Sequence, residues 1–278
     1  MARIVAQKLT TNIKQAVVVE NRAGATGIIG ATVVAHAPAD GYTILLGTPA
    51  PLSIAGGSGR KLTYDPLKDF VWVTQGVLLT PIMVVAPNAP YKTVADLIAL
   101  AKTKPGAMTY ASAGIGNSQH LAGELFKQMA GIDTLHVPYQ GGAMAMPAIA
   151  AGQTDYFFSD PSALPQVRSG KLRALAVTTL KRSAQLPDTP TVSESGLPGY
   201  EYSNWYGFLV PSKTPKPVVQ RLFKELTAVL QAPDVKEKLV NAGMEPAPSA
   251  SPEEMDGFLA KDQEKWARVV KTAKITFD

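Results

Sequence analysis

The sequence predicts an α/β protein of two lobes, each a mostly parallel sheet flanked by helices, with a ligand cleft between the lobes. Strand-like apolar runs alternate with helical runs along much of the chain, a pattern typical of sheets covered by helices on both faces. Two isolated strand-like segments, residues 81–85 and 205–210, suit crossings between lobes, and helices follow the second. We therefore expect one discontinuous lobe of residues 1–82 plus 208–278 and a second lobe of residues 83–207.

The first lobe opens with a helical segment at residues 2–9 and an apolar run at 16–19 that predicts a buried strand. A glycine run at 24–30 opens the next helix, and its glycines serve either tight packing or ligand contact. Residues 42–46 predict another strand, which ends at Thr48. Ligands of open α/β sheets gather at the carboxyl ends of strands, so Thr48 is a candidate ligand contact, with a simple turn residue as the alternative.

The second lobe begins with a helix at residues 94–102, which Thr93 caps and Asp96 completes as a capping box. Beyond it the sequence predicts strands at 109–112, 135–137, 156–158 and 173–177, then a loop at 182–204. Three helices are expected to follow, starting near Thr214, Asp234 and the capping box at Ser251.

The most informative stretch is the turn that joins the 109–112 strand to the helix after it. Gly114 and Gly116 let a ligand approach the backbone, and Asn117 or Ser118 can cap the first helical turn. The remaining N–H groups of that turn, with the positive end of the helix dipole, form a small anion cradle. Carboxylate and phosphate both match this description.

Ser112 and His120 also invite a catalytic interpretation, with Glu124 one turn beyond His120 to orient it. Ser112 does not lie in a G-x-S-x-G elbow, so this hydrolase hypothesis is the alternative to a polar ligand contact or cap. Two further strand ends carry candidates for ligand binding. Gly141 follows the 135–137 strand, and Asp160 follows the 156–158 strand, where it could contact an amino or hydroxyl group or serve as a cap.

Other site classes are not predicted. His120 and Glu124 have metal-ligand spacing, but the chain holds three histidines, no cysteine and no tight ligand cluster, so we expect no metal. Gln119 stands where a dinucleotide fingerprint needs its third glycine, which argues against a nicotinamide cofactor. No cofactor of any kind is predicted.

Composition narrows the function classes further. The net charge of +5, from 27 Lys and Arg against 22 Asp and Glu, is spread along the 278 residues without a basic stripe and interleaved aromatics, so no nucleic-acid partner is expected. No apolar run reaches the length of a membrane helix, and no secretory leader pattern is visible. The absence of cysteine fits an oxidising compartment.

Several motifs in fixed order closely resemble one family, the substrate-binding proteins of tripartite tricarboxylate transporters, also called the Bug family. The resemblance runs over essentially the whole chain and is carried by residues 18–25, 40–43, 110–120, 137–142, 169–177 and 186–191. It implies a two-lobed fold like the type II periplasmic binding proteins. It also implies a periplasmic, non-catalytic protein that captures a small mono- or dicarboxylate and delivers it to membrane subunits of a transporter.

In that family two loops hold the carboxylate like a pincer, and one of them matches residues 112–118. The family's signal peptide, first strand and first glycine-rich loop have no counterpart ahead of residues 2–9. The resemblance then implies a weakened pincer. It also implies a first lobe with a gap, a strand borrowed from elsewhere in the chain, or a strand from another copy. The expected state is a monomer, with a strand-exchanged dimer as the alternative.

Overall fold

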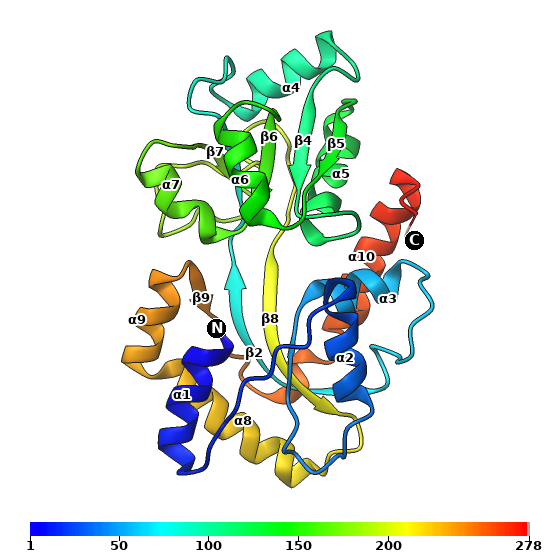
Figure 1. The fold of residues 1–278 in the computed structure, drawn as a ribbon, viewed down its shortest axis with the longest axis vertical. Helices are drawn as coiled ribbons and strands as arrows, with labels where there is room; N and C mark the ends of the chain where they lie inside the picture. The colour runs from blue at the N-terminus through cyan, green and yellow to red at the C-terminus, as the bar shows by residue number, and fades with distance from the viewer. Residues whose placement is uncertain (277–278) are drawn as a thin grey trace. The chain divides into compact units, whose positions relative to one another are not determined.

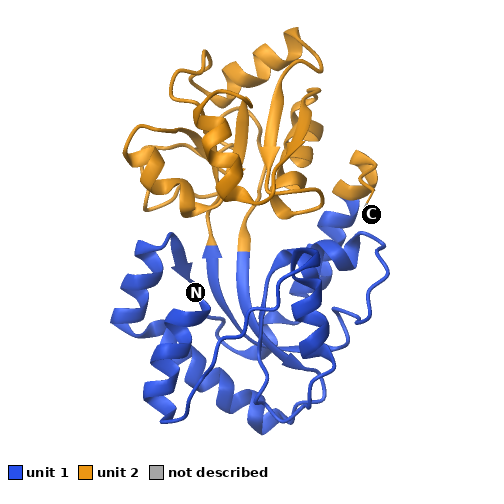
Figure 2. Ribbon diagram, in the orientation of Figure 1, with its two compact units in different colours: residues 1–78, 205–268 blue, residues 79–204, 269–278 orange. Residues whose placement is uncertain are grey.

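The computed structural model describes residues 1–276 and divides into two compact units (Figure 2). Unit 1 comprises Met1–Leu78 and Trp205–Arg268, and unit 2 comprises Leu79–Asn204 and the residues from Val269 onward. The chain leaves unit 1 at the end of one long strand and re-enters it at the start of another, β2 (Phe70–Leu79) and β8 (Asn204–Pro211). The predicted functional lobes, with boundaries at 82/83 and 207/208, stay a prediction.

Unit 2 is built on a five-stranded sheet of order β5-β4-β6-β3-β7. Figure 1 labels four of these strands, β5, β4, β6 and β7. Its strands are β3 (Ile82–Val85), β4 (Thr109–Ser112), β5 (Leu135–Pro138), β6 (Tyr156–Ser159) and β7 (Arg173–Val177). Its helices are α4 (Val94–Thr103), α5 (Ser118–Ala130), α6 (Gly142–Ala150) and α7 (Leu164–Arg168), with a short 3₁₀ turn η3 (Pro161–Ala163) before α7. All four strands predicted between residues 109 and 177 are confirmed.

The sheet of unit 2 is mostly parallel, as predicted, with one reversed strand. Strand β4 is parallel to both β5 and β6, as helical crossovers require, whereas β3 is antiparallel to β6 and β7. Because β3 is antiparallel to both β6 and β7, these two strands run in the same direction, and β3 alone is reversed. The four strands that run in the same direction, β4, β5, β6 and β7, therefore have their carboxyl ends, and the loops that follow them, at one edge of the sheet.

Helix α4 begins with the predicted capping box, which the structure confirms. The Thr93 side chain accepts a hydrogen bond from the Asp96 N–H at 3.1 Å, and the Asp96 carboxylate accepts one from the Thr93 N–H at 3.0 Å. We expect Thr93→Ala to lower the free energy of unfolding by about 1 kcal/mol, the usual value of such a cap. Urea titration measures this. Thr103→Ala, the same substitution at the other end of α4, is the control and should cost less than half as much.

Unit 1 contains a four-stranded sheet of order β1-β8-β2-β9, in which β1 (Leu45–Gly47) runs antiparallel to β8 and β9 is Met244–Pro246. Its longer helices are α1 (Ala2–Ile13), α2 (Ile28–Ala35), α8 (Lys216–Gln231), α9 (Pro233–Asn241) and α10 (Phe258–Ala273), whose last residues belong to unit 2. Its shorter turns are η1 (Ala25–Gly27), η2 (Ala50–Ile54), α3 (Ala55–Gly57) and η4 (Pro252–Met255). Trp72, Trp205 and Phe258 pack ring against ring in its core.

Two sequence expectations in unit 1 are corrected, and one strand is absent from the sequence predictions. Residues 16–19 form no strand: they run as coil between α1 and α2, and the Val18 side chain is 84% exposed. A strand needs a paired neighbour for its backbone, and no described strand pairs with these residues. Strand β2 was not predicted. Ser251 caps η4 rather than the long last helix, because Asp256 turns to extended backbone and ends that turn before α10 begins.

Within residues 1–276 no helix combines the length and the apolar character needed to cross a membrane.

Candidate functional site

The turn in which the sequence predicts an anion cradle joins β4 to α5 in unit 2, and we call residues 112–118 the 112–118 loop. The Asn117 side chain caps α5 by accepting a hydrogen bond from the His120 N–H at 2.9 Å, so the predicted cap is confirmed and falls to Asn117 rather than Ser118. Gly114 and Gly116 have φ angles of 134° and 73°, which side chains with a Cβ rarely adopt. Both glycines are therefore required by the path of the backbone.

Several of the loop's backbone amides already have acceptors within unit 2. The Ala113 N–H donates to Gln119 Oε1, the Gly114 N–H to Ser112 Oγ, and the Gly116 N–H to His120 Nδ1, at 3.0, 3.1 and 3.0 Å. The first N–H groups of α5, at Ser118 and Gln119, lie beyond reach of any intrahelical carbonyl. The loop is thus held by internal bonds, while the start of α5 supplies donors for an anion.

Two neighbouring strand ends join the loop at the same edge of the sheet. The Tyr139 N–H donates to Ser112 O at 2.9 Å, and the Gly141 N–H donates to Ala113 O at 3.3 Å. Gly141, at a φ of 101°, is the N-cap of α6 and offers no side chain to cap that helix. Its place brings the N-terminus of α6 beside the 112–118 loop.

Asp160 follows β6, the strand beside β4, and precedes η3. Its Oδ1 is buried and has no hydrogen-bond partner among the described residues, and burial raises the pKa of this carboxyl. A buried acceptor without a donor costs free energy, so Asp160 is suited to a donor group on a ligand.

Thr48 lies in unit 1, directly after β1, and is half-buried. The structure leaves its role as a ligand contact a prediction.

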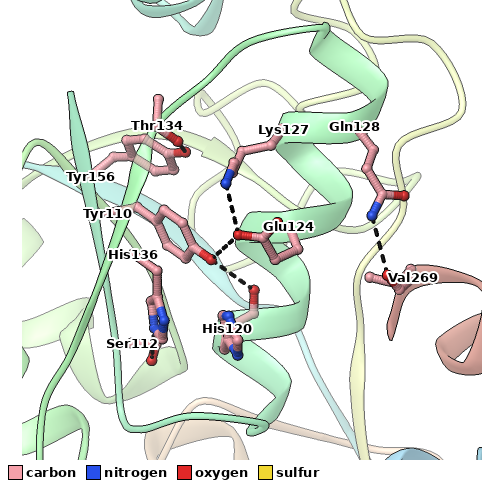
Figure 3. Close-up of polar contacts among 10 residues, drawn as sticks. All are labelled: Tyr110, Ser112, His120, Glu124, Lys127, Gln128, Thr134, His136, Tyr156 and Val269. Atoms are coloured by element: carbon pink, nitrogen blue, oxygen red, sulfur yellow. Dashed lines mark hydrogen bonds and ion pairs between the residues drawn. The ribbon is translucent and has the colours of Figure 1, made fainter. Parts of the chain in front are cut away.

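The hydroxyl of Ser112 has a histidine partner, but not the expected one. Ser112 Oγ lies 2.7 Å from Nε2 of His136, in β5, and the serine is fully buried (Figure 3). His120 instead binds Gly116 through Nδ1. Glu124 accepts from the Tyr110 hydroxyl at 2.6 Å and pairs with Lys127 at 3.0 Å, so it does not orient His120. The Ser112–His120–Glu124 arrangement that a hydrolase would need is not formed.

Four aromatic side chains pack together beneath the loop, and we call them the ring cluster. His120 and His136 stack with centroids 3.8 Å apart and planes 9° from parallel, Tyr110 stacks on His136 at 4.9 Å, and Tyr156 stacks on Tyr110 at 5.6 Å. Burial lowers the pKa of His120 to about 4, helped by the positive charge of Lys127. Burial, followed by the neighbouring His120, lowers the pKa of His136 to about 3. Both imidazoles are therefore neutral at pH 7.

Sequence reasoning missed His136 and Asn204. His136 reads as an ordinary strand residue, and only the register of β4 with β5, which pairs Tyr110 with His136, brings it under the loop. Asn204 donates through Nδ2 to Ser118 Oγ at 3.4 Å and to the Tyr202 hydroxyl at 3.0 Å. Its buried Oδ1 has no partner among the described residues. The distance of Asn204 from the loop along the chain hides it from any local motif.

Residues 1–276 contain no group of three His, Cys, Asp or Glu side chains placed to hold a metal ion. His120 and Glu124, which have metal-ligand spacing, are each engaged in the hydrogen bonds described above.

Comparisons with known proteins cover almost the whole chain. Residues 1–275 match the model of the tripartite tricarboxylate transporter family receptor, TctC. The chain is 34% identical to the protein BugT of Bordetella pertussis over 98% of this chain and 83% of that protein.

Two solved structures of Rhodopseudomonas palustris proteins have similar folds. Rpa4515 with adipate is 36% identical, with a TM-score of 0.89 over 99% of this chain and 92% of that one. MatC (Rpa3494) with bound malate is 28% identical, with a TM-score of 0.84 over 97% and 92% of the two chains. These matches confirm the predicted two-lobed α/β class and the family resemblance.

Proposed function

Because this chain belongs to the tripartite tricarboxylate transporter family of receptors, we propose that its 112–118 loop binds the carboxyl group of the small acid that it captures. Receptors of this family bind solutes for a transporter and are not enzymes. Relatives at 36% and 28% identity hold adipate and malate, and small carboxylates are therefore the ligand class of this chain. Which acid it takes is a matter for measurement.

The observation that carries this assignment is the convergence of three strand ends at one edge of the unit 2 sheet. The first turn of α5 and the uncapped start of α6 offer backbone N–H groups and the positive ends of two helix dipoles, which favour an anion. We propose that Gly114, Gly116, Asn117, Ser118 and Gly141 shape this surface. In the same proposal Asp160 contacts a donor on the ligand, and Ser112 and His120 support the loop from its buried side. Thr48, in unit 1, stays a separate candidate ligand contact at the end of β1.

Isothermal titration calorimetry tests the proposal with adipate, malate, succinate and the dimethyl ester of adipate. At least one diacid should bind, and the ester should not, because it lacks the charge that the N–H groups recognise. Binding of the ester as tightly as of adipate would contradict carboxylate recognition.

A loop variant ties the binding to this site. Gly114→Ala forces a Cβ onto a backbone with φ at 134°, and the strain of about 1–3 kcal/mol shifts the loop. We expect affinity for the bound diacid to fall about tenfold to hundredfold. Gly131→Ala, at the other end of α5, is the matched control: its φ is also positive, at 61°, and its Cβ would meet nothing within 4 Å. It should leave affinity unchanged.

The remaining assignments follow the family. We propose that residues 1–82 plus 208–278 and residues 83–207 act as the two lobes of the receptor, that it works in the periplasm, and that it delivers its ligand to membrane subunits of the transporter. We further propose a monomer. A strand-exchanged dimer would use the outer edge of β1, which lies at the side of its sheet among the described residues. Size-exclusion chromatography with light scattering distinguishes the two.

A further inference from the structure

We propose that His120 and His136 are positioning residues for the ligand: each fixes the 112–118 loop through one ring nitrogen, and the pair sets the affinity for the carboxylate without touching it. This inference rests on the proposed function, since it concerns the same loop.

His120 acts through Nδ1. The Gly116 N–H can only donate, so the ring nitrogen that it reaches at 3.0 Å must carry a lone pair, and the proton of the neutral ring lies on Nε2. The side chain is 6% exposed, and water is therefore a poor substitute for this acceptor. Without Nδ1, the buried Gly116 amide would lose its partner and the glycine turn would lose its anchor.

His136 acts through Nε2, at the other end of the loop. The Ser112 hydroxyl donates to Gly114 O at 3.0 Å and accepts from the Gly114 N–H at 3.1 Å. A hydroxyl has one proton, and with that proton on Gly114 O it accepts a second bond from His136 Nε2–H at 2.7 Å. His136 thereby orients the one side chain that closes the turn on Gly114.

The two histidines cannot move independently. Their rings lie 3.8 Å apart and nearly parallel, and the Tyr110 ring packs against both, with its centroid 4.9 Å from that of His136 and 6.3 Å from that of His120. Tyr110 is itself held by its hydrogen bond to Glu124, which also pairs with Lys127 (Figure 3). Through the hydrogen bonds of its two histidines, the ring cluster therefore holds Ser112, Gly114 and Gly116, three alternate positions of the loop, against the core of unit 2. Because neutral rings make both bonds, burial of the pair keeps the loop fixed at pH 7.

Crossed isosteric substitutions test the inference. Asn places its side-chain oxygen where His has Nδ1, and Gln places its terminal amide where His has Nε2. We expect His120→Asn and His136→Gln to have affinities for adipate or malate within about threefold of that of the unchanged protein. His120→Gln and His136→Asn should have affinities about tenfold lower or more, because each loses one hydrogen bond. If the histidines acted through packing alone, the same substitution would be the better tolerated one at both positions. The proposal instead predicts that Asn is better tolerated at position 120 and Gln at position 136.

Equal affinities for all four variants, or the reverse order, would overturn the inference. Nitrogen-15 NMR of the unchanged protein gives a second readout that does not depend on the variants folding. Both imidazoles should be neutral with the proton on Nε2, and a proton on Nδ1 of His120 would refute the proposed bond. If the unchanged protein binds none of the diacids but shows these tautomers, the proposed function fails while the anchoring of the loop stands.

Discussion

The free energy of unfolding of unit 2 is expected to fall by about 4 kcal/mol between pH 7 and pH 5 because of two buried histidines. His120 and His136 have pKa values of about 4 and about 3 in the folded protein, against an ordinary value of 6.5. As the pH falls below 6.5, the two imidazoles become protonated in the unfolded chain but stay neutral in the folded protein. Stability is therefore complete above pH 7, decreases as the pH falls toward 4, and levels off below the folded pKa values.

Hydrogen exchange of the β4 and β6 amides measures this in unit 2 alone. The double variant His120→Asn, His136→Gln is the matched control, because it keeps the two hydrogen bonds and cannot titrate. Its stability should change by less than about 1 kcal/mol over the same interval, in which few carboxyl groups titrate. His36, the remaining histidine, lies in unit 1 and does not contribute to this readout. The same pH slope in both proteins would show that the histidines are not its source.

Gly123→Ala is expected to cost about 2–3 kcal/mol, although alanine has the higher helix propensity by about 1 kcal/mol. A Cβ at this position of α5 would lie 2.2, 2.6 and 2.8 Å from three carbons of the Tyr110 ring. That ring is fully buried, packs against the rings of His136 and Tyr156, and donates a hydrogen bond from its hydroxyl to Glu124. Neither α5 nor the Tyr110 ring can move away without disrupting the ring cluster.

Chemical denaturation followed by hydrogen exchange in β4 gives the size of this effect. Gly142→Ala, in α6, is the control for stability: its Cβ would come no closer than 3.7 Å to any atom, and it should stay within about 0.5 kcal/mol of the unchanged protein. In a Tyr110→Leu background the added methyl group has space, so Gly123→Ala should cost less there. An equal cost in both backgrounds would contradict the ring contact as its cause.

Local signals in the sequence were sufficient where the chemistry is local. The Thr93 capping box, the Asn117 cap and the two glycines of the 112–118 loop each depend on residues within a few positions of one another. The four strands of unit 2 between 109 and 177 were found for the same reason, as short apolar runs bounded by turn residues.

What the sequence did not reveal depends on pairing between distant segments. The contact of Ser112 with His136 follows from the register of two strands separated by a helix, and no motif near Ser112 in the sequence predicts it. The strand prediction for residues 16–19 was wrong because a strand forms only beside a partner strand. Their apolar character suits a strand, but the sequence does not show whether a partner is present. The unpartnered oxygens of Asp160 and Asn204 are likewise properties of burial in three dimensions.

The internal hydrogen bonding of the 112–118 loop bears on how such receptors diversify. In the proposed site the head group is recognised by main-chain amides, which does not depend on the exposed side chains of the loop, such as Ile115 at 55% exposure. Random substitution can alter that outer position freely, while the glycines and the buried rings beneath must stay. Proteins that descend from one ancestral gene can therefore keep the proposed binding of the carboxyl group. They can acquire new preferences for the rest of the ligand with few changes in sequence.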